Sequence, residues 1–155
     1  MSRLPLAVLL LVVVGASGCG GGSAAKERPR LSNDEFVEEG NGVCIRSDRR
    51  VFRIGGLGPA PGPWERTARA AATSIREMRE LRPPAAKQRQ FDALLVSAEK
   101  VRRAVSDVHD ALVAQRYERA REAQIRAVRA DAEVKRIAHG LGLTFCEQLL
   151  TNWPA

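Results

Sequence analysis

Residues 91–112, FDALLVSAEKVRRAVSDVHDAL, decide the fold because they carry the clearest hydrophobic periodicity in the chain. Their apolar side chains recur at alternating spacings of three and four residues, which places them along one side of an α-helix. The members of this seam are Phe91, Leu94, Ala98, Val101, Val105, Val108 and Leu112. A helix of this kind buries its seam against partner helices, so the stretch predicts a helical bundle.

The residues that follow, 116–141, predict a further helix with a seam of its own. Continued past Leu112, the first seam would reach only polar side chains, namely Gln115, Arg119, Glu122, Arg126 and Arg129. A second seam, shifted in phase, runs through Ala120, Ala123, Ala127, Ala130, Val134, Ile137 and Leu141. This break in phase predicts a turn at residues 114–116 and hence an antiparallel helical hairpin. One continuous helix across 85–139, with a skip in its repeat, is the alternative.

Two local features belong to this last helix. Gly140 and Gly142 are expected to cap its C-terminus, where glycine is the preferred residue. Glu122 with Arg126, and Asp131 with Lys135, have the spacing of ion pairs on one helix face.

The chain before this hairpin predicts two more helices. One carries Trp64, Ala68, Ala71, Ile75 and Met78 and ends at Pro83, and the next helix begins at Pro84. Residues 55–63, rich in Gly and Pro, are expected to be a linker. An earlier helix is expected to begin at Ser32, which has the spacing of a capping box with Glu35. Gly40 and Gly42 interrupt it, so we expect it to be the weakest of the four helices.

These elements predict an all-α fold, an up-down-up-down four-helix bundle tied by one disulfide. The first and last helices would lie antiparallel as neighbours, and residues 140–146 would fold back along the first helix. Seven extended residues span up to ~23 Å, and Cys44 lies ~15 Å into the first helix. A bridge between Cys44 and Cys146 is therefore within reach.

The N-terminal stretch predicts export. Arg3, the apolar residues 4–14 and the small residues 15–18 form a secretion signal, and the apolar run is too short for the ~20 residues of a membrane span. With Cys19 and the glycines after it, the stretch resembles the lipobox of bacterial lipoproteins. That resemblance implies a signal peptide at 1–18, a lipid-anchored flexible stalk at 19–31 and a bundle domain at 32–155.

Lipidation of Cys19 would anchor the protein to the outer face of the cell membrane. The alternative is a freely secreted protein, because Ala16 stands where the lipobox usually has a larger apolar residue and residues 16–18 also satisfy an ordinary secretion signal. With Cys19 lipidated, the other two of the three cysteines, Cys44 and Cys146, make an even pair. An oxidising compartment then makes their disulfide the expected state.

Three short motifs in the bundle resemble small exported helical proteins and lipoproteins of high-GC bacteria. They are Phe36 with Val43-Cys44, Arg116-Tyr117 with Ala120, and Gly142-Leu143-Thr144-Phe145-Cys146. The resemblance implies a disulfide-tied helical domain and supplies no activity.

A net charge of +7 at pH 7 makes the chain basic, but charge alone selects no partner. Two rows of arginine recur at helical spacing, one with Arg66, Arg69, Arg76 and Arg79 and one with Arg116, Arg119, Arg126 and Arg129. They are either a solvated surface or an anion-binding surface for an anionic wall polymer or lipid headgroups. No specific nucleic-acid partner is predicted.

Catalytic residues, metal ligands and cofactor sites are not predicted. His109 and His139 are the two histidines, and we expect the first to be solvated at a seam edge and the second to lie near a helix C-terminus. Trp64 is expected in the core at a bundle end and Trp153 in a frayed terminus. The sequence thus favours a non-enzymatic, membrane-anchored envelope binding or structural module. The alternatives are a polyanion-binding lipoprotein and an enzyme or cofactor carrier whose site the sequence does not display.

Overall fold

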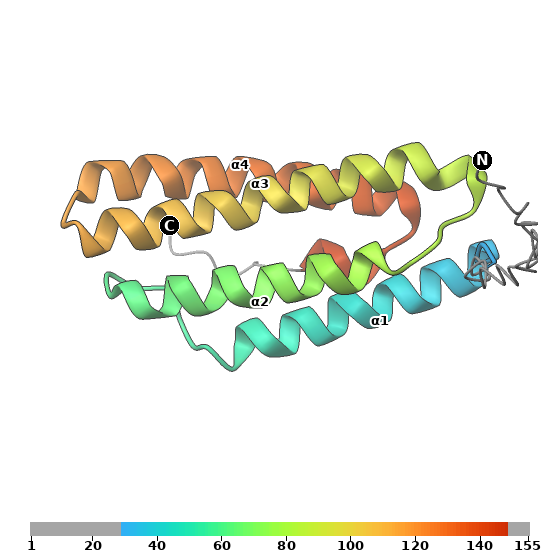
Figure 1. The fold of residues 1–155 in the computed structure, drawn as a ribbon, viewed down its shortest axis with the longest axis horizontal. Helices are drawn as coiled ribbons and strands as arrows, with labels where there is room; N and C mark the ends of the chain where they lie inside the picture. Colours follow the sequence, from blue (N-terminus) through green and yellow to red (C-terminus); the bar gives the residue numbers. More distant parts are fainter. Residues whose placement is uncertain (1–28, 149–155) are drawn as a thin grey trace, which may run out of the picture.

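The computed structural model describes residues 29–148, which form four helices that run alternately up and down (Figure 1). The long helices are α1 (Asn33–Phe52), α2 (Pro61–Arg79), α3 (Gln88–Val113) and α4 (Tyr117–Leu141). Two short 3₁₀ helices, η1 (Ala85–Lys87) and η2 (Thr144–Gln148), precede α3 and follow α4. The predicted all-α four-helix bundle is confirmed, and no strand occurs within these residues.

The predicted hairpin between α3 and α4 is confirmed, and the alternative of one continuous helix is wrong. Gln115 adopts a left-handed conformation with φ of 54°, and the amide of Arg116 donates to the carbonyl of Ala111 at 2.8 Å. These are the features of a Schellman motif, which ends a helix by satisfying its last carbonyl groups. The phase break in the seam therefore marks a real change of direction.

The C-terminus of α4 closes in the same way, at Gly142. This residue has φ of 82°, and the amide of Leu143 donates to the carbonyl of Ala138 at 2.9 Å. The prediction that Gly142 caps α4 is confirmed. The prediction for Gly140 is wrong, because this residue lies inside the last turn of α4 with helical conformation.

The start of α1 agrees with the sequence, whereas the start of α2 does not. Ser32 and Glu35 form the predicted capping box in both directions. Helix α2 begins at Pro61, inside the stretch predicted as a linker. Proline suits the first turn of a helix because the amide that it lacks has no partner there. At the next junction, η1 takes up residues 85–87, so α3 itself begins at Gln88 rather than at Pro84.

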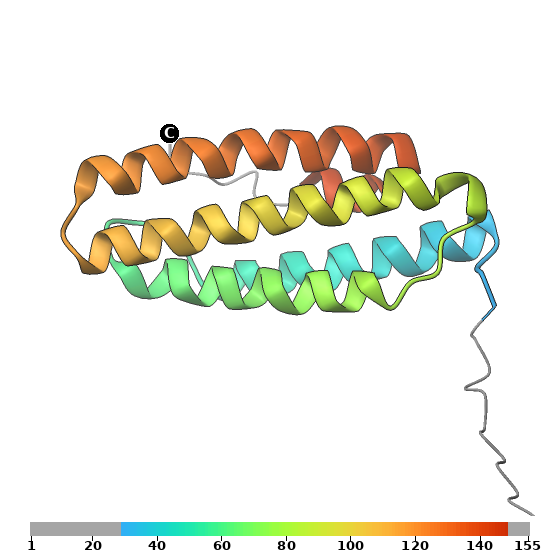
Figure 2. The ribbon, with the colours of Figure 1, turned by 45° about the horizontal axis from the view of Figure 1, so that its top comes forward.

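Helix η2 changes the expected arrangement of the bundle. Helices α1 and α4 run antiparallel, as predicted, but η2 lies between them and contacts both (Figures 1 and 2). Helix α1 packs on α2, α2 on α3, and α3 on α4. The direct contact expected between the first and last helices is therefore largely replaced by the segment that follows α4.

The core contains most of the predicted seam residues, together with residues from η2 and its approach; the seam residues Ala68, Ala98, Leu112 and Ala130 are only partly buried against it. Phe36 of α1 packs edge-on against Phe91 of α3, with ring centroids 5.4 Å apart. Leu143 and Cys146 belong to the same buried cluster, whereas Phe145 is half exposed. Trp64 is buried, as predicted, and its Nε1 donates to the carbonyl of Gly58 at 2.8 Å.

The folded part begins slightly before residue 32. The amide of Leu31 donates to the carbonyl of Arg82 at 2.8 Å, and Arg30 donates to the carbonyl of Pro83 at 3.0 Å. The last residues of the predicted stalk are therefore fixed to the α2–α3 connection. The predicted signal peptide, Cys19 and Trp153 lie outside the described residues. Among residues 29–148, none of the helices has the length and apolar character needed to cross a bilayer.

Candidate functional site

The disulfide predicted from the sequence is present. Cys44 in α1 and Cys146 in η2 are bonded, with their Cα atoms 5.0 Å apart and 102 residues between them in the chain. Both side chains are buried. The bond therefore ties the middle of α1 to η2, the last helix of the described chain.

Several contacts place η2 so that this bond can form. Gly40 of α1 leaves room for Leu143, whose Cδ2 would lie only 2.6 Å from a Cβ at position 40. The side-chain oxygen of Asn41 accepts a hydrogen bond from the amide of Phe145 at 3.1 Å. On the α3 side, Lys87 donates to the carbonyl of Leu141 at 2.9 Å. Gly40, a weak point by helix propensity alone, is thus where α1 receives Leu143, the residue directly before η2.

A small apolar cavity of about 90 Å³ is lined by residues of all four long helices. Ala71, Ala98 and Val105 are among the apolar residues that line it. Thr67 also faces it, and its buried hydroxyl oxygen has no hydrogen-bond partner within the described part of the chain. Asp131 of α4 is the carboxylate in the wall.

Asp131 is a buried acid held by one cation. Its carboxylate lies 2.9 Å from Nζ of Lys135, which confirms the predicted ion pair. Burial raises the pKa of Asp131, and the hydrogen bond and charge of Lys135 oppose that rise. Raised carboxyl pKa values in cavities are a feature of acid–base sites. The cavity of about 90 Å³ is too small for a substrate, since ligand pockets measure about 300–1,000 Å³, so we read the pair as structural.

Sequence reasoning did not single out Asp131 as a buried group. The signal was present, because Asp131 follows the seam residue Ala127 by four positions and so lies on the buried side of α4.

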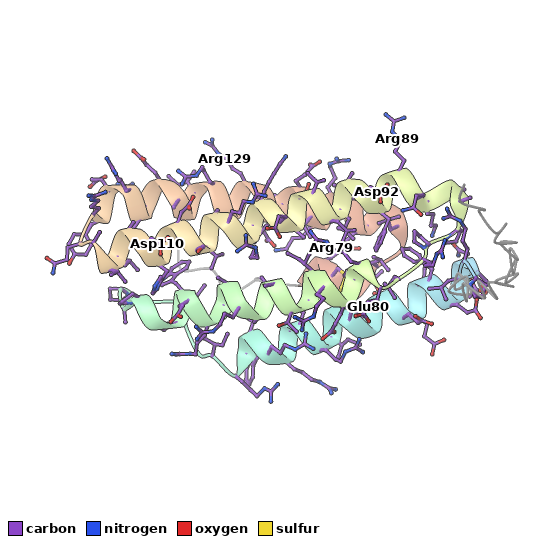
Figure 3. All side chains as sticks on the ribbon, in the orientation of Figure 1. Arg79, Glu80, Arg89, Asp92, Asp110 and Arg129 are labelled. Carbon is purple, nitrogen blue, oxygen red and sulfur yellow. A yellow bond between two sulfur atoms is a disulfide. The ribbon has the colours of Figure 1, made fainter. Side chains whose placement is uncertain are left out.

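The two predicted arginine rows do not come together. Their helices, α2 and α4, lie on either side of α3, and Arg129 points outward from α4 whereas Arg79 lies beside α3 (Figure 3). Arg69 pairs with Glu65 of its own helix. Six of the eight arginines make no ion pair with any described residue; they are Arg66, Arg76, Arg79, Arg116, Arg119 and Arg129.

Arg126 corrects the other predicted helix pair. Its guanidinium binds Asp107 of α3 at 3.0 Å instead of Glu122 of its own helix. Both side chains are about half exposed. Arg126 thus pairs with Asp107 on the facing helix in place of Glu122, one turn away on α4. This ion pair links α3 to α4.

A third basic cluster, missed by the sequence analysis, lies at the end of α1. Arg46, Arg49, Arg50 and Arg53 occur within eight residues, and Phe52 beside them is 80% exposed. Glu77 of α2 binds both Arg46 and Arg50, which joins the two helices. Arg49 and Arg53 form no ion pair with a described residue. The density of arginine in this short stretch was the sequence signal that could have revealed the cluster.

The histidines take part in structural contacts. His109 is half-buried rather than solvated, and its Nδ1 donates to the carbonyl of Pro61 at 3.1 Å, which joins α3 to the start of α2. Nδ1 of His139, near the end of α4, lies 3.1 Å from Glu147 of η2. Within residues 29–148, no group of three or more His, Cys, Asp or Glu side chains is arranged to hold a metal ion.

Comparison with known proteins adds no further assignment: no protein-family model, no curated protein and no solved structure matches this chain significantly.

Proposed function

We propose that this chain is an exported lipoprotein, anchored at the outer face of the cell membrane through Cys19. The helical bundle serves as a non-enzymatic binding or structural module of the cell envelope. The Cys44–Cys146 disulfide carries the proposal. It accounts for two of the three cysteines, so Cys19 alone is left for lipid. A buried disulfide that closes most of the domain is typical of proteins from oxidising compartments.

Metabolic labelling with an alkyne analogue of palmitate in a bacterial host tests the anchor. The full chain should be labelled and recovered with membranes, and Cys19→Ser should be unlabelled. The matched control, Cys44→Ser with Cys146→Ser, should keep the label because it retains Cys19. An unlabelled chain cleaved after residue 18 and found in the medium would identify the freely secreted alternative instead.

A second candidate function is binding of a polyanion, such as an anionic wall polymer. The observation that favours it is the set of six arginines, in α2 and in α4 with its N-cap, that make no ion pair with a residue in 29–148, since paired arginines are already neutralised by their neighbours. Arg116→Gln with Arg119→Gln should weaken binding to a soluble anionic polymer, and added salt should weaken it further. Arg69→Gln, which removes an arginine already paired with Glu65, is the control. Absence of binding at low ionic strength would remove this candidate.

A further inference from the structure

Helix α1 lies at the edge of the bundle, with one face turned away from it. Its buried face packs on α2 and on η2 (Figures 1 and 2). The residues on the opposite side are exposed or half-buried, and they follow one another at spacings of four, seven, four and three. They are Asp34, Glu38, Ile45, Arg49 and Phe52, and we call them the outer stripe. Asn41 lies at its edge, where its side chain accepts a hydrogen bond from the amide of Phe145 in η2. Such spacing makes a continuous surface along a helix.

The outer stripe divides its charges between its two ends. Asp34 and Glu38 lie in the first half, and Arg49 lies in the second half with Arg53 directly beyond the helix end. The helix macrodipole favours acids in the first turn and bases in the last. Glu38 and its neighbour Glu39 lie past the first turn, so interaction with the helix dipole does not account for these two acids. One half of this face is therefore negative over two turns. The other half is net positive, because Arg49 and Arg53 outnumber its single exposed acid, Asp48.

Between these ends the face carries no charge, and Gly42 and Ile45 make it small and partly apolar. A side chain at Gly42 would approach only the guanidinium of Arg46, at 3.4 Å, so the surface there is open. Ile45 beside it is half-buried. Phe52, the last residue of α1, lies within the basic half and is 80% exposed, a large aromatic surface in contact with water. Exposed apolar groups flanked by charge are typical of protein–protein contact surfaces.

We propose that α1 pairs antiparallel with α1 of a second copy of this chain, about a two-fold axis near residues 43–44. In this register Glu38 faces Arg49 of the second copy, Asp34 faces Arg53, and Gly42 faces Ile45. Two-fold symmetry repeats every contact, so the single face is complementary to itself. A polyanion fits this face less well, because it would meet the acidic half of the helix as well as the basic half.

Photo-crosslinking of the full chain in cells tests where the contact lies. Ile45→p-benzoylphenylalanine should give an adduct of two copies of the chain, because position 45 lies close to the axis. The matched control is Val113→p-benzoylphenylalanine, at the end of α3, where the native side chain is 60% exposed. It should give no such adduct. Absence of a self-adduct from position 45, or an adduct there with a different protein alone, would overturn the proposal.

Charge reversal tests the register. One variant, Asp34→Lys with Glu38→Lys, makes the face positive throughout; another, Arg49→Glu with Arg53→Glu, makes it negative throughout. These positions leave the Glu35 capping box and the Arg46 and Arg50 pairs with Glu77 intact. Full chains with two different tags are co-expressed, extracted in non-ionic detergent at low salt and co-purified. Each variant should lose at least about tenfold of its self-pairing, since like charges then oppose one another.

Mixing the two variants supplies the decisive comparison. A positive face and a negative face should pair with each other at least as well as two wild-type chains, and this recovery also shows that both variants are folded. The control variant, Arg116→Glu with Arg119→Glu, changes charges at the start of α4, away from α1. It should leave self-pairing unchanged. Self-pairing that survives in both reversed variants would overturn the antiparallel register, as would failure of the mixture to pair. A wild-type chain that stays monomeric would overturn the interface itself.

Discussion

Asp131 is a carboxylate at a position where the pattern of α4 would accommodate an apolar side chain. It is 5% exposed, and Lys135 is the cation bound to it. Desolvation of a charge opposes folding unless its partner compensates fully, and the raised pKa of Asp131 indicates that Lys135 does not. The cavity beside it has room for a larger apolar group. Asp131 therefore costs stability that a different residue would recover.

The substitution Asp131→Leu should stabilise the fold by about 1–2 kcal/mol at pH 7, because it removes a buried charge and fills apolar space. Lys135 is then released, and its partly exposed side chain can reach water. Since folding raises the pKa of Asp131, the wild-type acid favours the folded state most at low pH and loses that advantage as pH rises through the folded-state pKa. The gain from Asp131→Leu should therefore grow from pH 3 to pH 7.

Urea unfolding of both proteins at the two pH values measures this gain. Asp110→Asn is the control, because Asp110 is exposed and its side chain makes no hydrogen bond or ion pair with a described residue. A gain that is equal at pH 3 and pH 7 would mean that filling the cavity, and not removal of the charge, explains the effect.

At the scale of the element, Gly40 and Gly42 in α1 have opposite roles. Gly42→Ala should stabilise the protein by about 1 kcal/mol, because alanine is the better helix former and its Cβ meets only a flexible arginine at 3.4 Å. Gly40→Ala gains the same propensity but places its Cβ 2.6 Å from Leu143, which is fully buried. Overpacking of this kind costs about 1–3 kcal/mol, so Gly40→Ala should destabilise the protein.

Thermal unfolding followed by circular dichroism compares the two variants directly. High salt is used so that any pairing of α1 between chains is screened. Equal stabilisation by both substitutions would show that Leu143 does not pack against α1 at Gly40.

These glycines also show what the sequence can predict at this scale. The seams, the capping box and the hairpin followed from local spacing, since each depends on residues within one or two turns. The role of Gly40 did not, because it depends on Leu143, about a hundred positions away in the chain. The early start of α2 was missed for a different reason: Gly and Pro were read as breakers, although Pro61 begins a helix.

At the scale of the whole molecule, the order of the helices was predictable and the place of η2 was not. The pairing of Cys44 with Cys146 followed from counting cysteines and from the reach of the chain. The insertion of η2 between α1 and α4 depends on how Leu143 and Cys146 fill the core, which no periodicity encodes. For the candidate sites, the arginines were found from spacing, but their partners on facing helices, such as Asp107 for Arg126, required the fold.

The disulfide should contribute a large part of the stability of the whole molecule, because it joins α1 to η2 and so closes a loop that contains most of the bundle. In the chain-entropy model, closing a loop of 102 residues stabilises the folded state by about 4–5 kcal/mol. The double variant Cys44→Ala with Cys146→Ala should lose a similar amount. Guanidinium unfolding with and without a reducing agent measures it: the reductant should lower the midpoint of the wild type and leave that of the double variant unchanged. A wild-type midpoint that is insensitive to reductant, with two free thiols detected by mass analysis, would contradict the bond and with it the assignment of the third cysteine, Cys19, to lipid.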